Sequence, residues 1–259
     1  MKFLILLIGL VFLSSCAPVA PPSRPPVAPI ESPERMADRL LARIEAQAGA
    51  FNSLSGMAKV RISHPERNIN ANQVLFVQKP DRFRAEVLSP FGNPLLMTAA
   101  NGRQLDAYIP SKGRFYRGEP DLENLQRFIP IPLRLTDLVH IMLYDPLMID
   151  FQVRRAALEG AGYRLDLLAD NGVRQALLFD DRLRMLQTGY FVDDELQFQI
   201  EYDNFTESGP AFPLSIEIDM PFYRTNVSLS FREPEINPDI PEKRFSLTPP
   251  DGVRVLPFP

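Results

Sequence analysis

The sequence contains no tryptophan, one cysteine and two histidines among its 259 residues. A single cysteine excludes a disulfide bond within the chain and a cysteine-based metal site. His64 and His140 have no partners at the spacing of metal ligands, and no nucleophile-elbow or phosphate-loop motif occurs. We therefore expect neither a cofactor nor a catalytic residue, and we expect that the protein is not an enzyme.

The chain also lacks an excess of positive charge, since its formal net charge is -4. A mildly acidic chain argues against nucleic acid as a partner and against attachment to anionic lipid by charge alone. Acidic residues cluster at 180–181 and 193–195, in segments with the character of turns. These clusters favour solvated turns over a calcium site.

A short basic start and an apolar run occupy the N-terminus. Lys2 precedes an apolar segment at residues 3–13, and Ser14, Ser15 and Cys16 follow it directly. The segment is too short to span a bilayer, which takes roughly 20 residues, but it suits a secretory signal. Its end resembles the lipobox of bacterial lipoproteins, which implies a signal peptide at 1–15 and a lipid on Cys16. The alternative is an ordinary signal peptide that leaves a free thiol.

Proline dominates the next segment, which with Cys16 forms a predicted tether at residues 16–33. Seven prolines lie between residues 18 and 33, a composition that favours extended polyproline II. At roughly 3.1 Å per residue, this tether reaches on the order of 50 Å. A domain beyond it can stand off the membrane while it stays attached.

Residues 34–232 have the pattern of one α+β domain. Ser32 and Pro33 suit the start of a helix, and apolar residues then recur at steps of three and four up to Phe51. Alternation with period two follows and predicts about 10–11 antiparallel strands in one sheet. Helical spacing at 121–144 interrupts the strands, so we expect helices on one face of the sheet. Residues 233–259 are Pro-rich and predict an extended tail with an edge strand at most.

Phe91 lies at a predicted hairpin tip, between Pro90 and Gly92. Large apolar side chains usually avoid turns, because turns lie on the surface. Two interpretations remain open at this point. Phe91 either folds back onto the sheet, or it reaches outward to contact acyl chains or a bilayer.

Several short motifs resemble the LolB family of outer-membrane lipoprotein receptors. They are SPFG at residues 89–92, NGR at 101–103, IPIPL at 129–133 and LSGMA at 54–58. The resemblance covers residues 34–232, whereas FSLTPPDG at 245–252 is more similar to the LolA-like carriers that share this fold. The chain departs from the family in having Phe91 where the family has leucine, and in having no tryptophan.

The resemblance implies an open antiparallel half-barrel, with helices that cap its concave face over a cavity for acyl chains. It also implies receipt of lipoprotein or lipid cargo from a LolA-like periplasmic carrier and its release into the outer membrane. Phe91 would be the membrane-insertion tip, and the absence of aspartate at Ala17 favours the outer membrane. The alternative is a structural or adaptor envelope lipoprotein with a filled core. The residues that we expect to line the cavity are Val60, Phe83, Val87, Leu125, Phe128, Leu138, Met142, Leu165, Phe198, Ile216 and Leu229.

Overall fold

The computed structural model describes residues 32–129 and 131–259. The predicted signal peptide, Cys16 and nearly all of the predicted tether lie outside the described residues. Within the described part of the chain, no helix is both long enough and apolar enough to cross a membrane.

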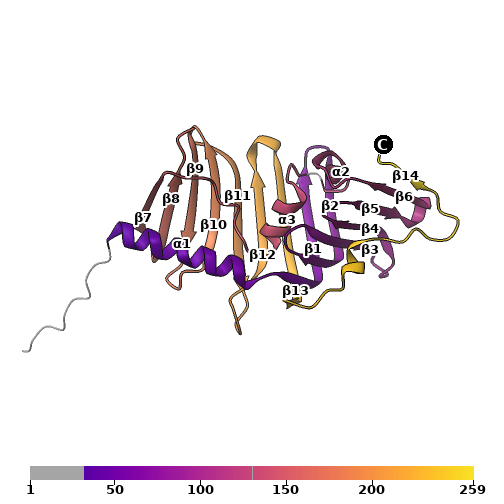
Figure 1. Cartoon of the computed structure of the whole chain (residues 1–259), viewed down its shortest axis with the longest axis horizontal. Coiled ribbons are helices and arrows are strands. Elements are labelled where there is room, and N and C mark those ends of the chain that lie inside the picture. Colours follow the sequence, from indigo (N-terminus) through magenta and orange to yellow (C-terminus); the bar gives the residue numbers. More distant parts are fainter. Residues whose placement is uncertain (1–31, 130) are drawn as a thin grey trace, which may run out of the picture. The chain divides into compact units, whose positions relative to one another are not determined.

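One large sheet with a few helices makes up the described residues (Figure 1). The helices are α1 (Pro33–Ala50), α2 (Leu122–Gln126) and α3 (Leu135–Met142), with 3-10 turns η1 (Pro110–Lys112), η2 (Pro221–Tyr223) and η3 (Glu242–Phe245). The strands are β1 (Ser53–His64), β2 (Arg67–Gln78), β3 (Arg82–Leu88), β4 (Pro94–Asn101), β5 (Leu105–Ile109), β6 (Arg114–Gly118), β7 (Val153–Glu159), β8 (Gly162–Leu168), β9 (Val173–Phe179), β10 (Met185–Val192), β11 (Glu195–Phe205), β12 (Pro213–Met220), β13 (Thr225–Ile236) and β14 (Val255–Leu256).

The sheet consists of two antiparallel meanders, β1–β6 and β7–β13, joined where β1 pairs with β13. This pairing sets Val60 opposite Leu229 and Ile62 opposite Val227, far apart in the sequence. The strand order is β14-β6-β5-β4-β3-β2-β1-β13-β12-β11-β10-β9-β8-β7. Because its first and last strands do not pair with each other, the sheet is open.

The predicted number of 10–11 strands is too low, since the described residues contain fourteen. Several strands give no clear alternation: β5 and β6 have five residues each, and β14 has two. In β9, Ala176, Leu177 and Phe179 are all buried, so both faces of the strand are covered. Strands of this kind are defined by their partners more than by their own sequence.

Helix α1 begins where the sequence predicts. The Ser32 side chain accepts a hydrogen bond from the Arg35 backbone N–H at 3.4 Å, and Pro33 fits the first turn. Leu40 and Ile44 are buried at helical spacing, against the half of the sheet that contains β7 to β12. The guanidinium of Arg43 donates to the Leu183 carbonyl just before β10, which fixes the helix on this face.

Two short helices occupy the predicted helical segment at 121–144. Asp121 caps α2 by accepting from the Asn124 backbone N–H at 2.8 Å. The Asp137 carboxylate accepts from the backbone and side chain of Arg134 and stabilises the start of α3. α3 contacts β2 and β3, so this segment lies against the first meander.

The chain beyond β13 packs on the first meander (Figure 1). β13 continues to Ile236, so the predicted domain limit at residue 232 falls inside a strand. Phe245 and Leu247 are buried, and β14 pairs with β6 in parallel at the edge of the sheet. The carboxylate of Asp106 accepts from the Leu247 backbone N–H at 2.9 Å, which fastens this segment to β5.

Candidate functional site

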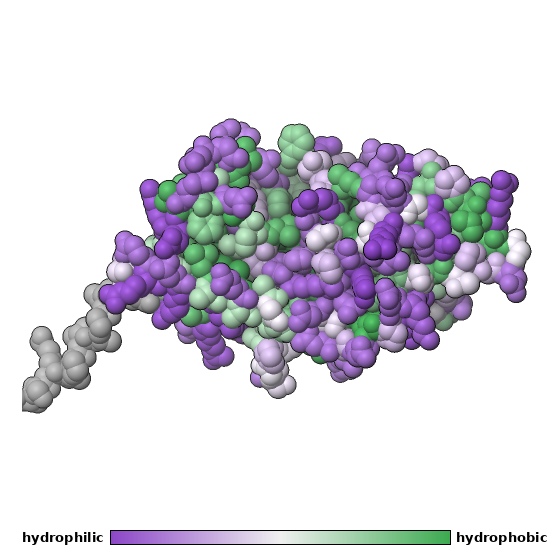
Figure 2. Space-filling view, in the orientation of Figure 1, coloured by the Kyte–Doolittle hydropathy of each residue, from purple (hydrophilic) through white to green (hydrophobic). Residues whose placement is uncertain are grey.

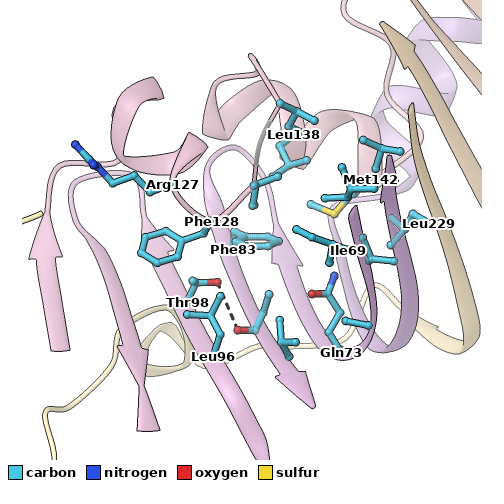
Figure 3. Close-up of a pocket in the computed structure, with 18 of the residues that line it drawn as sticks. Ile69, Gln73, Phe83, Leu96, Thr98, Arg127, Phe128, Leu138, Met142 and Leu229 are labelled. Carbon is cyan, nitrogen blue, oxygen red and sulfur yellow. Dashed lines mark hydrogen bonds between the residues drawn. The ribbon is translucent and has the colours of Figure 1, made fainter. Parts of the chain in front are cut away.

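A cavity of about 540 Å³ lies between the first half of the sheet and the segment that contains α2 and α3. Its sheet side is formed by side chains of β1, β2, β3, β4, β5, β12 and β13. Figure 3 shows Leu138 and Met142 of α3 on one side of it, and Phe83, Ile69 and Leu96 of the strands on the other. Most of the lining side chains are aliphatic or aromatic, so the cavity favours an apolar occupant.

Strand alternation and register together place the sheet side of the cavity. On β1 and β13 the alternate residues point to the same face, so Val60 and Ile62 lie beside Leu229 and Val227. Leu229 also lies opposite Ile216 on β12. The result is a continuous apolar surface across the β12–β13 hairpin and β1, which lies far from that hairpin in the sequence.

Phe128, its neighbours just after α2, and helix α3 contribute the opposite side. The Ile129 backbone N–H donates to the Leu125 carbonyl at 2.9 Å, which continues the α2 turn to the cavity edge. Leu125 itself is buried in the core and does not line the cavity. Leu138 and Met142 lie one helical turn apart on α3, so both reach the same cavity.

The structure brings eight of the eleven predicted cavity residues together in this cavity. They are Val60, Phe83, Val87, Phe128, Leu138, Met142, Ile216 and Leu229.

Leu125, Leu165 and Phe198 do not line the cavity. Leu165 lies on β8 and is fully buried in the other half of the sheet. Phe198 lies on β11 and stacks on Tyr190, with ring centroids 4.1 Å apart. Alternation predicts which face a side chain takes, but it does not predict how far along the sheet its strand lies.

Sequence reasoning missed the polar and charged residues of the cavity. Gln73 and Thr98 line it, and the Thr98 hydroxyl donates to the Ala85 carbonyl at 3.4 Å. Arg67, Lys112 and Arg127 lie at its boundary. The three charged residues lie beside turns or after a short helix, where no periodic pattern indicates a site.

Four turns lie at the same ends of their strands, because alternate turns of an antiparallel meander fall on one side. We call this set the rim: residues 64–67, 88–94, 109–114 and 220–225. Cavity residues Arg67, Ile109 and Lys112 belong to the rim, and Arg67 and Lys112 are exposed. The cavity therefore opens at the rim, and Figure 2 shows a hollow beside the β12–β13 hairpin with apolar side chains deep inside it.

Phe91 lies on the rim and is 91% exposed. Its turn is held by hydrogen bonds from the Gly92 N–H to the Ser89 carbonyl and from the Ser89 N–H to the Asn93 carbonyl. Gly92 has a φ of +85°, which a side chain would strain. The turn holds Phe91 away from the sheet, which excludes the packed interpretation.

Phe222 and Tyr223 form a second aromatic tip on the rim, at the β12–β13 turn. They are 80% and 48% exposed, and their ring centroids lie 5.2 Å apart in a T-shaped contact. The sequence reasoning missed this tip. The signal was a Pro-Phe-Tyr turn between two alternating strands, similar to the Pro-Phe-Gly turn of Phe91.

Neither histidine lines the cavity. His140 Nδ1 lies 2.9 Å from the Asp145 carboxylate, which also pairs with Lys79 at 2.6 Å. The His64 side chain accepts from the Glu66 backbone N–H at 3.2 Å in a turn. Among residues 32–129 and 131–259, no three His, Cys, Asp or Glu side chains gather as a metal site would require.

The fold resembles that of solved structures described as a LolA superfamily protein and as an outer-membrane lipoprotein-sorting domain. The chain superposes on a LolA superfamily protein from Nitrosomonas europaea with a TM-score of 0.53, at 15% identity, over 82% of this chain and 97% of that one. A lipoprotein-sorting protein domain from Vibrio parahaemolyticus gives a TM-score of 0.52 at 10% identity, over 81% and 96% of the two chains. A DUF1329 family protein from Desulfovibrio piger gives 0.53 at 13% identity, over 83% and 98%. No protein-family model matches the sequence, and no curated protein does.

Proposed function

We propose that this protein is a lipid-anchored, LolB-like acceptor that binds acyl chains and passes lipoprotein or lipid cargo to the outer membrane. One observation carries the proposal: an apolar cavity opens at the same rim that holds the exposed Phe91. A solved structure of similar fold is described as an outer-membrane lipoprotein-sorting domain, which supports the same class of function.

The cavity has a size and lining that suit an acyl chain. Its volume of about 540 Å³ lies within the range of roughly 300–1,000 Å³ typical of ligand pockets. An acyl chain gains about 0.8 kcal/mol for each CH₂ group moved from water to an apolar site. The cavity favours this proposal over an adaptor lipoprotein with a filled core.

The anchor belongs to the proposal, because Cys16 lies outside the described residues. In the proposal, lipid on Cys16 holds the protein at the periplasmic face of the outer membrane, and the Pro-rich segment gives the domain reach. A LolA-like carrier would deliver the cargo. The protein then moves lipid without making or breaking bonds, so it is not an enzyme.

Filling the cavity tests the proposal. Ala71 lines the cavity on β2, whereas Asn72 is exposed on the opposite face of the same strand. Residues 32–259 form a compact unit of their own, so the chain from residue 16 onward can be produced with Cys16→Ala, free of lipid. A fluorescent fatty-acid probe should bind this protein. Ala71→Trp should weaken that binding at least tenfold, because the indole occupies the space of the acyl chain.

Asn72→Trp is the matched control, and it should bind the probe as the parent chain does. Binding to neither the parent nor the control would refute the proposed cavity function. Equal binding by parent and Ala71→Trp would place the probe elsewhere on the molecule.

A further inference from the structure

The charged residues of the cavity all have the same sign. Arg67, Lys112 and Arg127 line it, and no aspartate or glutamate does. The whole chain, in contrast, has more acidic than basic residues, 32 against 28. The charge at the cavity is therefore opposite to that of the chain as a whole.

Arg67 and Lys112 lack the ion-pair partners that some other arginines of the chain have. Arg117 pairs with Asp106 and Arg164 pairs with Asp166, both within 2.8 Å. In contrast, Arg67 and Lys112 have no hydrogen bond or ion pair from their side chains within the described ranges.

Arg127 is only partly satisfied. Its Nη2 donates to the exposed Glu123 carboxylate at 2.8 Å, but its Nε is buried with no acceptor in the described part of the chain. Figure 3 shows Arg127 at the periphery of the pocket, beside Phe128. A buried N–H without an acceptor costs free energy, and an anionic oxygen from a ligand would satisfy it.

The positions of these cations match the geometry of an amphiphile. Arg67 and Lys112 lie at the rim, where the cavity opens, and the apolar side chains lie deeper. An acyl chain in the cavity would leave its polar group at the rim. Guanidinium and ammonium groups there suit a phosphate, which accepts several charge-assisted hydrogen bonds.

We propose that the cavity selects lipids with an anionic phosphate headgroup, recognised by Arg67, Lys112 and Arg127. This inference rests on the proposed function, since it requires that the cavity binds acyl chains. It goes further because the diacylglyceryl group of a lipoprotein is uncharged and gives these cations no partner. It also predicts that anionic lipids bind in preference to neutral ones, although a chain of net charge -4 would as a whole repel them.

Competition between two lipids with the same acyl chain tests the inference. Palmitoyl-lysophosphatidylglycerol carries an anionic phosphate, and monopalmitoylglycerol is neutral. Below the concentrations at which they form micelles, each displaces the fluorescent fatty-acid probe from the Cys16→Ala chain. The anionic lipid should bind roughly tenfold more tightly or better, the effect of one charge-assisted hydrogen bond.

The triple variant Arg67→Gln, Lys112→Gln and Arg127→Gln should lose this preference, so that the two lipids bind it with similar affinities. The matched control replaces three exposed cations that do not line the cavity, Lys59→Gln, Arg61→Gln and Arg103→Gln, and it should keep the preference. Higher salt should weaken the preference, because the rim is open to solvent.

The outcomes separate the two proposals. If the probe binds and both lipids compete equally, the headgroup inference fails while acyl binding stands. A preference that survives in the triple variant also refutes the inference. If the probe does not bind the parent chain at all, the proposed function itself fails.

Discussion

At the scale of single residues, aromatic side chains divide into two groups with opposite environments. Phe91 and Phe222 stand on turns and are almost fully exposed. Tyr144, just after α3, and Tyr202 on β11 are both buried, with ring centroids 4.8 Å apart. The exposed side chains contribute little to folding. Their presence on the rim therefore favours contact with a membrane or another molecule.

Phe91→Ala should leave stability nearly unchanged, within about 0.5 kcal/mol, because the side chain loses few contacts. Thermal melts measure this, and a loss of about 3–5 kcal/mol would indicate a packed residue instead.

Burying a phenylalanine in lipid gains roughly 1.5–3 kcal/mol. Phe91→Glu should therefore slow transfer of the acyl probe to liposomes while probe binding persists. Phe91→Leu is the control and should transfer normally.

Two buried tyrosines should respond differently to loss of the hydroxyl. The Tyr144 hydroxyl donates to the Met185 carbonyl at 2.8 Å, whereas the buried Tyr202 hydroxyl has no partner among the described residues. Tyr144→Phe should cost about 0.5–1.5 kcal/mol. Tyr202→Phe should be neutral or stabilising, because it removes an unsatisfied polar atom. Urea unfolding of both variants measures the difference, and an equal loss would argue for an unseen partner of Tyr202.

At the scale of elements, one buried carboxylate helps to hold the segment after β13 on the sheet. Asp106 on β5 is 1% exposed and accepts from Arg117 Nε at 2.7 Å and from the Leu247 N–H. Arg117 also donates to the Leu247 carbonyl at 3.0 Å. The Asp106 side chain holds the pKa of Arg117 above its usual value through these hydrogen bonds. Strand and tail are thus joined by a network that no local pattern predicts.

Asp106→Ala should cost about 1–3 kcal/mol, because it leaves the Leu247 N–H and the Arg117 guanidinium without their acceptor. It should also expose residues 237–259 to proteolysis, measured by limited digestion and mass spectrometry. Asp251→Ala removes an exposed carboxylate from the same segment and serves as the control. Intact protection of the segment in Asp106→Ala would contradict the role of this network.

At the scale of the whole molecule, three buried tyrosines make stability depend on alkaline pH. Burial raises the pKa of Tyr144, Tyr190 and Tyr202 above the usual value of 10.0. The unfolded chain therefore loses these protons near pH 10, while the folded chain retains them. Stability should be complete below pH 10 and should fall above it, since the unfolded state then binds fewer protons.

The urea midpoint should accordingly drop as pH rises from 9 to 11. Each tyrosine contributes up to about 1.4 kcal/mol per pH unit in the region between its unfolded and folded pKa values. The Tyr202→Phe variant should show a shallower drop than the parent chain. A parent chain with a flat profile over this range would show that the tyrosines titrate when folded.

The sequence alone determined the features that depend on local pattern. Alternation with period two predicted an antiparallel sheet, and the Ser32-Pro33 pair predicted the start of α1. The Pro-Phe-Gly turn predicted that Phe91 lies at a hairpin tip, because proline fixes φ at a value that turns use and glycine accepts the positive φ that turns need. Each of these features arises from residues close together in the chain.

Only the tertiary structure decided where those elements meet. Strand order placed Leu165 and Phe198 away from the cavity, although their alternation matched that of Val60 and Leu229. The tertiary structure also brought Arg67, Lys112 and Arg127 to one cavity. It paired β14, near the C-terminus, with β6 in the first half of the chain. Alternation fixes the face of a strand, but register and order depend on long-range pairing, and no local sequence signal encodes that pairing.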